Sequence, residues 1–445
     1  MRGKCCNHIL LLLLFATTCS HAGVSITNLL SFDNFSNGAV PRPRLILYTN
    51  GLFYGTTSYG AQYDQGTVFK VTSDGQLTTL LAFNTTNGAE PYGGLIAAKD
   101  GTFYGTTTQG GVSNSGTIFK ITPDGVINTL YSFTNGSPST GLIEASDGNF
   151  YGTSDFGGDY NCGMVYRLTS SGVMTTLVSF NLTNGQDPMS RLVEGTDGNF
   201  YGTTRLGGAA NYGTIFKMTT DGTLTTLVSF YYTNGCWPVG ELTQGRDGNL
   251  YGTTCGLLFS NYGTAFRMTT NGLLTTLVYF NGTNGGTPMT ELVQLTDGSF
   301  IGTTSGGGDH NSGTVFQLWP DGGFRTLYSF TGGNDGGSPH ATPIQASDGN
   351  LYGITSAGGA YHYGTLYRLS VPLQPFFRSV TQTAKTVELT WNTVAGQSYQ
   401  LQYKTNVAST NWCFLGDFFI ATNGTSTVSD SITPDEQRFY RVISQ

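Results

Sequence analysis

Short apolar runs alternate with Asp-Gly turns along most of this chain. One complete unit, from Met189 to Phe230, contains in order Arg191-Leu-Val-Glu, a turn at Asp197-Gly198, Phe200-Tyr-Gly-Thr-Thr204, a Gly/Asn loop, Gly213-Thr-Ile-Phe-Lys-Met218, a turn at Asp221-Gly222 and Leu224-Thr-Thr-Leu-Val-Ser-Phe230. Runs of Val, Ile, Thr, Tyr and Phe bounded by Asp-Gly pairs are typical of strands joined by tight hairpins. Each unit is therefore predicted to form four antiparallel strands, which we name a to d.

This unit recurs along the chain. The tyrosine of strand b, or its replacement, returns at spacings of 47 to 51 residues, at Tyr54, Tyr104, Tyr151, Tyr201, Tyr251, Ile301 and Tyr352. Repetition at such a period indicates an array of similar structural units.

Strand c indicates how the units pack. In Val68-Phe69-Lys70-Val71, apolar residues point to both faces, whereas a sheet with one face in solvent would alternate apolar and polar residues. Such a strand needs a cover on both faces, which a ring of four-stranded sheets packed face to face supplies. We also expect the glycine of Tyr-Gly-Thr in strand b to let neighbouring sheets approach closely.

The two ends of the repeat region complement each other. The seventh unit stops after Gly364-Thr-Leu-Tyr-Arg-Leu369 without a strand d, whereas Ile26-Thr-Asn-Leu-Leu-Ser-Phe32 matches a strand d. The simplest interpretation is an all-β fold in which residues 26–32 complete the last blade and close a seven-bladed β-propeller at residues 23–370. An open solenoid needs no such exchange, and closure removes exposed sheet edges.

The repeat also resembles a known family. The unit Asp-Gly-Asn-Phe-Tyr-Gly-Thr-Thr…Gly-Gly…Gly-Thr-Val-Phe-Lys…Leu-Thr-Thr-Leu-x-Ser-Phe is similar to the GloVer-type tandem repeat of secreted bacterial proteins over residues 26–370; Ile301 and the segment after Cys255 depart from it. The resemblance implies an extracellular or cell-surface bacterial protein, often with a variable C-terminal sorting module, and it brings no established catalytic residues.

After a linker at residues 371–378, the pattern changes. Val387, Leu389 and Trp391 alternate with polar residues, Tyr399, Leu401 and Tyr403 do the same, and a third strand is predicted at residues 438–443. Residues 379–445 resemble a small fibronectin type III-like β-sandwich with Trp391 in its core. We expect this sandwich to lack its final edge strand.

The first 22 residues are typical of an export signal. Arg2 and Lys4 precede the apolar residues 9–16, and Ser20-His21-Ala22 is a small-x-small cleavage pattern. The apolar stretch is shorter than the roughly 20 residues that span a bilayer. We therefore expect a secreted or cell-surface protein with no membrane span; the alternative of a lipid-modified Cys19 lacks the usual sequence context.

The negative net charge of the chain argues against one class of partner, the nucleic acids. The chain has a formal net charge of −7, and loss of Arg2 and Lys4 with the signal makes it −9. Because nucleic acids attract basic surfaces, nucleic-acid binding is not expected. Only 11% of the residues are charged, so the surface is predicted to be mostly neutral and polar.

Four cysteines follow the signal, which is too few for a disulfide scaffold: Cys162, Cys236, Cys255 and Cys413. Cys236 lies in the connector that enters the fifth unit, and Cys255 lies in the b–c loop of that unit. We predict a disulfide between them, as exported proteins can form; the alternative is two small buried residues.

The b–c loops vary in sequence while the Asp-Gly turns are uniform, so the end of the sheets that carries these loops is the predicted binding face. Aromatic rings with neighbouring amides and carboxylates suit neutral polar ligands such as sugars, because rings stack and amides form hydrogen bonds. The candidate binding residues are Tyr59, Tyr63, Asp64, Asp155, Asp159, Tyr160, Arg205, Asp309, His310, Tyr361 and His362.

Other loop residues have plainer interpretations. Tyr212, Tyr262 and Tyr363 share one loop position and are expected to pack between adjacent loops. Asp309 and His310 are adjacent but have no third ligand at a suitable spacing. We therefore predict no catalytic residue, no metal and no cofactor.

The expected function is that of a monomeric, secreted or cell-surface binding protein that presents a propeller face to a glycan or an extracellular protein. The alternative is an extracellular polysaccharide hydrolase or lyase, which requires carboxylates that converge at one mouth of the channel. A structural surface component is the third candidate.

Overall fold

A computed structural model describes residues 24–256, 262–371, 377–383, 385–393, 397–406, 409–422, 425–432 and 438–444. They divide into two compact units, Val24–Ser370 and a C-terminal unit that begins at Val371. The predicted export signal and most of the predicted linker lie outside the described residues.

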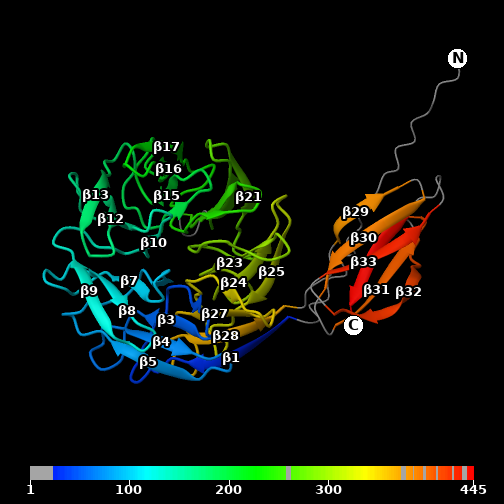
Figure 1. The fold of residues 1–445 in the computed structure, drawn as a ribbon, viewed down its shortest axis with the longest axis horizontal. Coiled ribbons are helices and arrows are strands. Elements are labelled where there is room, and N and C mark those ends of the chain that lie inside the picture. Colours follow the sequence, from blue (N-terminus) through cyan, green and yellow to red (C-terminus); the bar gives the residue numbers. More distant parts are fainter. Residues whose placement is uncertain are drawn as a thin grey trace, which may run out of the picture. The chain divides into compact units, whose positions relative to one another are not determined.

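The larger unit contains seven sheets of four antiparallel strands within its described residues. Sheets 1 to 3 comprise β2 (Ile46–Leu47), β3 (Phe53–Thr57), β4 (Thr67–Val71) and β5 (Leu77–Ala82); β6 (Leu95–Ala97), β7 (Phe103–Thr107), β8 (Thr117–Ile121) and β9 (Ile127–Ser132); and β10 (Ile143–Glu144), β11 (Phe150–Ser154), β12 (Met164–Leu168) and β13 (Met174–Ser179). Sheets 4 to 6 comprise β14 (Val193–Glu194), β15 (Phe200–Thr204), β16 (Thr214–Met218) and β17 (Leu224–Ser229); β18 (Thr243–Gln244), β19 (Leu250–Thr254), β20 (Thr264–Met268) and β21 (Leu274–Tyr279); and β22 (Val293–Gln294), β23 (Phe300–Thr304), β24 (Thr314–Leu318) and β25 (Phe324–Ser329). The sheets follow one another around a common centre, which makes the unit propeller-like (Figure 1).

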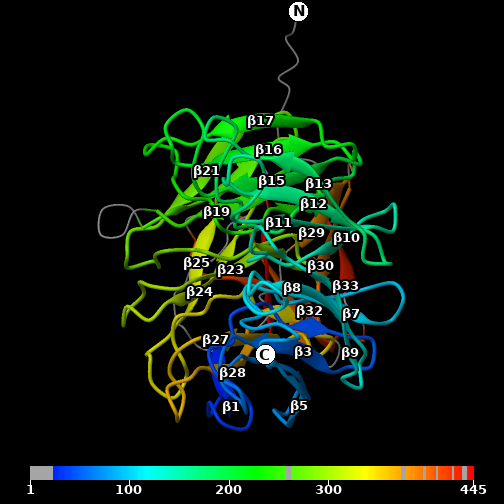
Figure 2. The ribbon, with the colours of Figure 1, turned by 90° about the vertical axis from the view of Figure 1, so that its left-hand side faces the viewer.

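Sheet 7 combines strands from both ends of this unit. It comprises β26 (Ile344–Gln345), β27 (Leu351–Thr355), β28 (Thr365–Ser370) and β1 (Ser25–Ser31). β1 pairs antiparallel with β28, from Ser25 opposite Ser370 to Ser31 opposite Thr365. Figures 1 and 2 show β1 beside β28 from two directions. The N-terminal strand therefore occupies the place of strand d in the last sheet.

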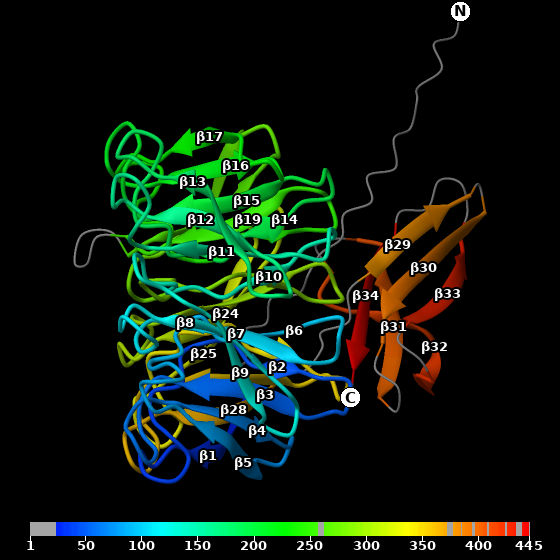
Figure 3. The same ribbon diagram turned by 60° about the vertical axis from the view of Figure 1, so that its left-hand side comes forward.

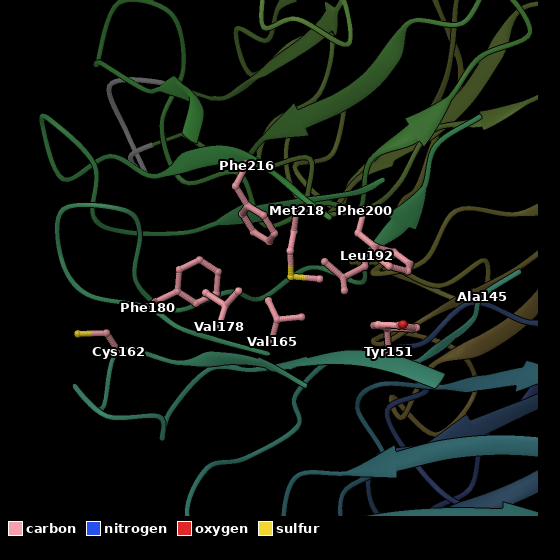
Figure 4. Close-up of a cluster of buried hydrophobic side chains, with 10 residues drawn as sticks. All are labelled: Ala145, Tyr151, Cys162, Val165, Val178, Phe180, Leu192, Phe200, Phe216 and Met218. Carbon is pink, nitrogen blue, oxygen red and sulfur yellow. The ribbon is translucent and has the colours of Figure 1, made fainter. Parts of the chain in front are cut away.

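Strand c of each sheet is covered on both faces, as the sequence pattern predicts. In β4, Val68 packs with residues of sheet 2, while Phe69 and Val71 pack with residues of sheet 7. Figure 4 shows the equivalent layer between sheets 3 and 4, where Val165, Val178 and Phe180 face Phe216 and Met218. Each sheet thus buries apolar side chains against both of its neighbours.

An aromatic pair joins each sheet to the next. The first ring follows strand d and the second belongs to strand c of the next sheet, with centroids 5.2 to 5.8 Å apart, in Phe83–Phe119, Phe133–Tyr166, Phe180–Phe216, Phe230–Phe266, Phe280–Phe316, Phe330–Tyr367 and Phe32–Phe69. The pair Phe32–Phe69 joins sheet 7 to sheet 1.

The glycine of strand b has a different role from the one predicted. A Cβ atom at Gly202 would lie 2.5 Å from Cζ of Phe216, which is the cross-strand partner of Gly202 within the same sheet. The glycine therefore makes room for an aromatic ring of its own sheet, not for a neighbouring sheet. The same ring packs against Phe180 at the interface with the preceding sheet.

The described residues of the C-terminal unit form two three-stranded antiparallel sheets. One contains β29 (Phe377–Gln382), β30 (Thr386–Asn392) and β33 (Thr425–Ser431); the other contains β32 (Cys413–Ile420), β31 (Ser398–Lys404) and β34 (Phe439–Ser444). Trp391 is fully buried in a core with Leu389, Leu401 and Tyr440, to which both sheets contribute. The predicted core position of Trp391 is therefore correct.

Candidate functional site

The larger unit has two ends that differ in the length of their connections. The tight a–b and c–d turns lie at one end, which we call the turn end; the longer b–c loops and the connectors from strand d to the next strand a lie at the other, which we call the loop end. Figure 3 shows these connections gathered at the two ends of the sheets. All eleven candidate residues belong to the b–c loops of the loop end.

Three candidate tyrosines occupy one position at the tips of these loops. Tyr63, Tyr160 and Tyr361 each stand three residues before the glycine that leads into strand c, and their exposed fractions are 49%, 62% and 57%. His310 occupies the same position in sheet 6 and is also exposed. Rings at four places around the loop end are therefore open to a ligand.

A cavity of about 530 Å³ lies beside one of these tips. It is lined by Asp159, which precedes Tyr160, by Thr134 and Asn135 of the connector after sheet 2, and by Tyr131 of β9. A carboxylate, an amide, a hydroxyl and an aromatic ring thus line one hollow, whose remaining wall comes from Gly158, from Met164 of β12 and from Met174, Thr176, Leu177 and Ser179 of β13. Asp309, the equivalent of Asp159 in sheet 6, is exposed.

Asp64 and His362 stand at a position that shapes the loop. Asp64 has a φ of 54°, and its carboxylate accepts a hydrogen bond from the N–H of Gly60 at 2.8 Å. Asparagines make the same bond in other loops, at Asn114, Asn161, Asn211 and Asn311. Asp64 therefore stabilises the conformation of its own loop. Asp and Asn tolerate a left-handed backbone, and their side chains accept a hydrogen bond from a nearby backbone N–H. His362 replaces the asparagine at a φ of 67° and is exposed.

Tyr59 is engaged within the protein. Its hydroxyl is hydrogen-bonded to that of Tyr92, and Arg42 lies 5.0 Å from the centroid of the Tyr92 ring. Burial raises the pKa of Tyr92, and the bond to Tyr59 raises it further. Burial lowers the pKa of the nearby His340 to about 4, and Arg42 lowers it too. Tyr92 and His340 therefore stay uncharged near neutral pH, and the hydroxyl of Tyr59 is occupied by its bond to Tyr92.

The structure brings Asp155 and Arg205 together around a third residue. Arg205 forms an ion pair of 2.7 Å with Asp187, which the sequence analysis did not select. Burial raises the pKa of Asp155 to about 7, and the charge of Asp187 adds to this effect while Arg205 opposes it. Burial also raises the pKa of Asp187 against the opposing charge of Arg205. The guanidinium group of Arg205 thus lowers the pKa of both partly buried carboxyl groups, against the effect of burial.

The loop tyrosines that were expected to pack differ among themselves. Tyr212 is half-buried, with its ring 6.4 Å from that of Tyr232. Tyr262 and Tyr363 are 38% and 36% exposed, so much of each ring faces solvent. The packing interpretation therefore holds best for Tyr212.

The predicted disulfide is wrong for this structure, in which Cys236 and Cys255 are buried thiols. The sulfur of Cys255 lies 3.7 Å from the carbonyl oxygen of Gly256 and forms a weak hydrogen bond with it. Burial raises the pKa of Cys255 to about 12, and the nearby Cys236 adds to the effect. The alternative interpretation, two small buried residues, fits the structure.

Four charged residues that were not among the predicted site residues form a cluster at the centre of the unit. Glu291 forms ion pairs with Arg44 and, at 3.3 Å, with Arg191, which also pairs with Glu241 at 2.8 Å. These four residues, which we call the central cluster, share one repeat position at the entry to strand a, where other units carry Gly94, Gly141 and Thr342. A search of strand entries for residues that break the repeat would have found them.

The central cluster borders a cavity of about 710 Å³, which we call the central pocket. Its remaining wall comes from the first strands of sheets 2 to 5, including Ile143 and Val193, and from Lys99 of an a–b turn. None of the eleven candidate residues lines it. No group of three or more His, Cys, Asp or Glu side chains suited to a metal ion occurs among the residues that the structure describes.

Helices that are long and apolar enough to cross a membrane are also absent from the described part of the chain. No curated protein matches the chain significantly. Solved structures that resemble it include a puromycin hydrolase, with 13% identity, coverage of 81% of this chain and 60% of that chain, and a TM-score of 0.49. Others are a gluconolactonase from Xanthomonas campestris, with 14% identity, coverages of 76% and 98% and a TM-score of 0.41, and an ulvan lyase, with 12% identity, coverages of 76% and 94% and a TM-score of 0.44.

The repeat itself matches a family model three times in tandem. The matches cover residues 14–143, 134–295 and 256–402, and the family is described as the Gloeobacter/Verrucomicrobia repeat. Together they span far more than half of the chain, in agreement with the resemblance of the repeat unit. The chain therefore belongs to the Gloeobacter/Verrucomicrobia repeat family.

Proposed function

We propose that this protein is a secreted glycan-binding protein that holds its ligand at the loop end of a closed seven-bladed propeller. The observation that carries the proposal is the repeated exposure of an aromatic ring at one loop-tip position, in Tyr63, Tyr160 and Tyr361. A ligand that covers an exposed ring removes apolar surface from water, and the flat face of a sugar stacks well on a tyrosine.

The cavity beside Tyr160 supports the choice of ligand. Asp159, Asn135 and Thr134 offer hydrogen-bonding groups there, and Tyr131 adds a second ring. A few polar groups that converge beside apolar surface match the hydroxyl groups and carbon faces of a neutral sugar. The low content of charged residues, 11%, also favours a neutral polar ligand over a highly charged polymer.

The proposal includes closure of the ring, which gives the binding face rigidity. β1 pairs with β28, and the pair Phe32–Phe69 links the last sheet to the first. With both ends of the repeat region joined, each loop is fixed by a neighbour on either side. Rigid loops lose less entropy when a ligand binds.

A glycan array with the purified protein tests the proposal, together with hydrolysis and lyase assays on the glycans that bind. Tyr160→Ala and Asp159→Asn should each weaken binding at least tenfold. Val173→Ala is the matched control, because Val173 is 61% exposed but lies in the c–d turn of the same sheet. Product formation by the wild-type protein would instead support the enzyme alternative. Absence of binding to every glycan would favour a structural surface component.

Export and the C-terminal unit are part of the same proposal. The N-terminal pattern of residues 1–22 directs the chain out of the cytoplasm, and the C-terminal sandwich, which we take to be fibronectin type III-like, acts as a spacer or attachment module. Fractionation of cells that express the full chain, or a chain truncated after Ser370, tests both points. Full retention in the cytoplasm would contradict the first, and equal surface attachment of both chains would contradict the second.

A further inference from the structure

The central pocket has no role in the proposed glycan binding. Three of its charged residues come from sheets 4, 5 and 6, and Arg44 comes from sheet 1. Arg44 and Glu291 are 247 residues apart in sequence, and their ion pair joins sheet 1 to sheet 6, which have sheet 7 between them. The four charges are thus brought together by the circular arrangement of the sheets and not by the repeat itself.

Stability alone does not explain the central cluster. Gly94, Gly141 and Thr342 occupy the same position in other sheets, so the fold accepts small uncharged residues there. A buried ion pair generally stabilises a protein little, since desolvation offsets much of the attraction between the charges. Here the charges also border a cavity of about 710 Å³, within the range of small-molecule sites.

The two carboxyl groups on Arg191 are not equivalent. Burial raises the pKa of Glu241 to about 7, and the neighbouring Glu291 adds to the effect while Arg191 opposes it. Burial also disfavours the charge of Glu291, but Arg44 and Arg191 outweigh it and hold its pKa below the usual value. Glu241 is therefore the acid that gives up its charge most easily, and Glu291 stays paired with Arg44.

The other two carboxylates that line the pocket accept hydrogen bonds from backbone N–H groups of the preceding sheet. Glu144 accepts a hydrogen bond from the backbone N–H of Lys99 at 2.8 Å, and Glu194 accepts one from that of Ser146 at 2.9 Å. Both carboxylates thereby tie neighbouring sheets together. The side chain of Lys99 is largely exposed, and its ammonium group lies 3.9 Å from Glu144 and donates a hydrogen bond to the carbonyl oxygen of Ala145 at 3.3 Å.

We propose that the central pocket binds a small organic carboxylate of the sugar-acid class, whose carboxylate replaces Glu241 on Arg191 while Glu241 takes up one proton from solvent. Guanidinium and carboxylate groups match as planar bidentate partners, so the exchange keeps Arg191 fully paired. Arg44, which stays paired with Glu291 and is 37% exposed, and Lys99 also line the pocket. Ile143 and Val193 offer apolar wall to its carbon atoms.

Isothermal titration calorimetry with glucuronate as the probe and glucose as its uncharged counterpart tests this site. The wild-type protein should bind glucuronate and not glucose, and one proton should be taken up per ligand above pH 7, as measured in two buffers of different ionisation enthalpy. Affinity should then fall by about tenfold for each pH unit above 7, because the ligand competes with an increasingly ionised Glu241.

Glu241→Gln should bind glucuronate with an affinity that does not change between pH 7 and 9, and more tightly than wild type at pH 9. Asp155→Asn is the matched control: it removes a carboxyl group of similar pKa outside the pocket and should leave the pH dependence of wild type. Arg191→Gln should abolish binding, with circular dichroism as the check on folding. If that variant does not fold, the comparison of Glu241→Gln with Asp155→Asn decides.

Equal binding of glucose and glucuronate would overturn the proposal, as would no binding of glucuronate or a Glu241→Gln variant with the pH dependence of wild type. The result is independent of the glycan site at the loop end. Tyr160→Ala should leave glucuronate binding unchanged even if it abolishes binding to an arrayed glycan.

Discussion

The ring of Phe32 lies 5.6 Å from the ring of Phe69, and both side chains are fully buried. Phe32 follows the N-terminal strand β1 in sheet 7, whereas Phe69 lies in the third strand of sheet 1. The same geometry joins every other pair of neighbouring sheets. The contact between the ends of the repeat region is therefore built like the contacts within it.

Loss of the Phe32 ring should destabilise the repeat unit strongly. We expect Phe32→Ala to lower the free energy of unfolding by about 3–5 kcal/mol, because it leaves a cavity between sheets 7 and 1. Deletion of residues 26–32 should have a larger effect, since it also exposes the edge of β28. Denaturant unfolding measures both. Phe35→Ala is the control, because Phe35 is 81% exposed, and an equal loss in both point variants would contradict the closure.

A methyl group on strand b should strain the sheet. Gly202→Ala places a Cβ atom 2.5 Å from Cζ of Phe216, and we expect a loss of about 1–3 kcal/mol from overpacking. Phe216→Leu in the same chain should recover part of this loss, because the shorter side chain leaves room for the methyl group. At Gly306 an added Cβ meets only one atom, at 3.8 Å. Gly306→Ala should therefore be nearly neutral in the same thermal melts.

Asp155 should make the protein less stable as pH rises. Its folded pKa of about 7 lies above that of an unfolded aspartate, so the native state holds the extra proton between pH 4 and 7. Stability is then highest below pH 4 for this group and falls as pH rises toward 7. Relative to wild type, Asp155→Asn should therefore gain on the order of 4 kcal/mol of unfolding free energy between pH 4 and pH 8.

The measurement is denaturant unfolding of both proteins across that range. Asp159→Asn, in an exposed part of the same loop, serves as the control and should follow the wild-type curve. A difference between Asp155→Asn and wild type that stays constant with pH would rule out the titration of Asp155 as its cause.

The four cysteines beyond residue 22 should react unequally. Cys413 is exposed, whereas Cys162, Cys236 and Cys255 are buried, and burial raises the pKa of Cys255 to about 12. Because the thiolate is the reactive form, iodoacetamide should label Cys413 in the native protein and all four only after denaturation. Peptide mapping without reductant reads out the sites. Recovery of a Cys236–Cys255 disulfide peptide would contradict the structure.

Much of the fold was predictable because the repeat encodes contacts that recur in every unit. The apolar residues on both faces of Val68-Phe69-Lys70-Val71 predicted a strand covered on both sides, and Ile26 to Phe32 matched the strand that the last unit lacks. The role of Gly202 was not predictable from spacing. Only the register of strands b and c places it opposite Phe216.

The candidate functional site was also predictable only in part from the sequence. Sequence comparison between repeats pointed to the loop tips with Tyr63, Tyr160 and Tyr361, because residues at one repeat position reach one end of the sheets. It selected Asp155 and Arg205 as separate deviations, and only the structure supplied Asp187 as the partner of Arg205.

The sequence by itself determined the strands, their order and the apolar layers, since these depend on residues within one unit and its immediate neighbours. Only the tertiary structure decided which charges meet at the centre. Arg44 and Glu291 stand in units that are far apart along the chain, and their ion pair depends on the curvature accumulated over all the sheets between them. A sequence repeat predicts contacts within a unit and between adjacent units. It does not predict the contact of Arg44 in sheet 1 with Glu291 in sheet 6.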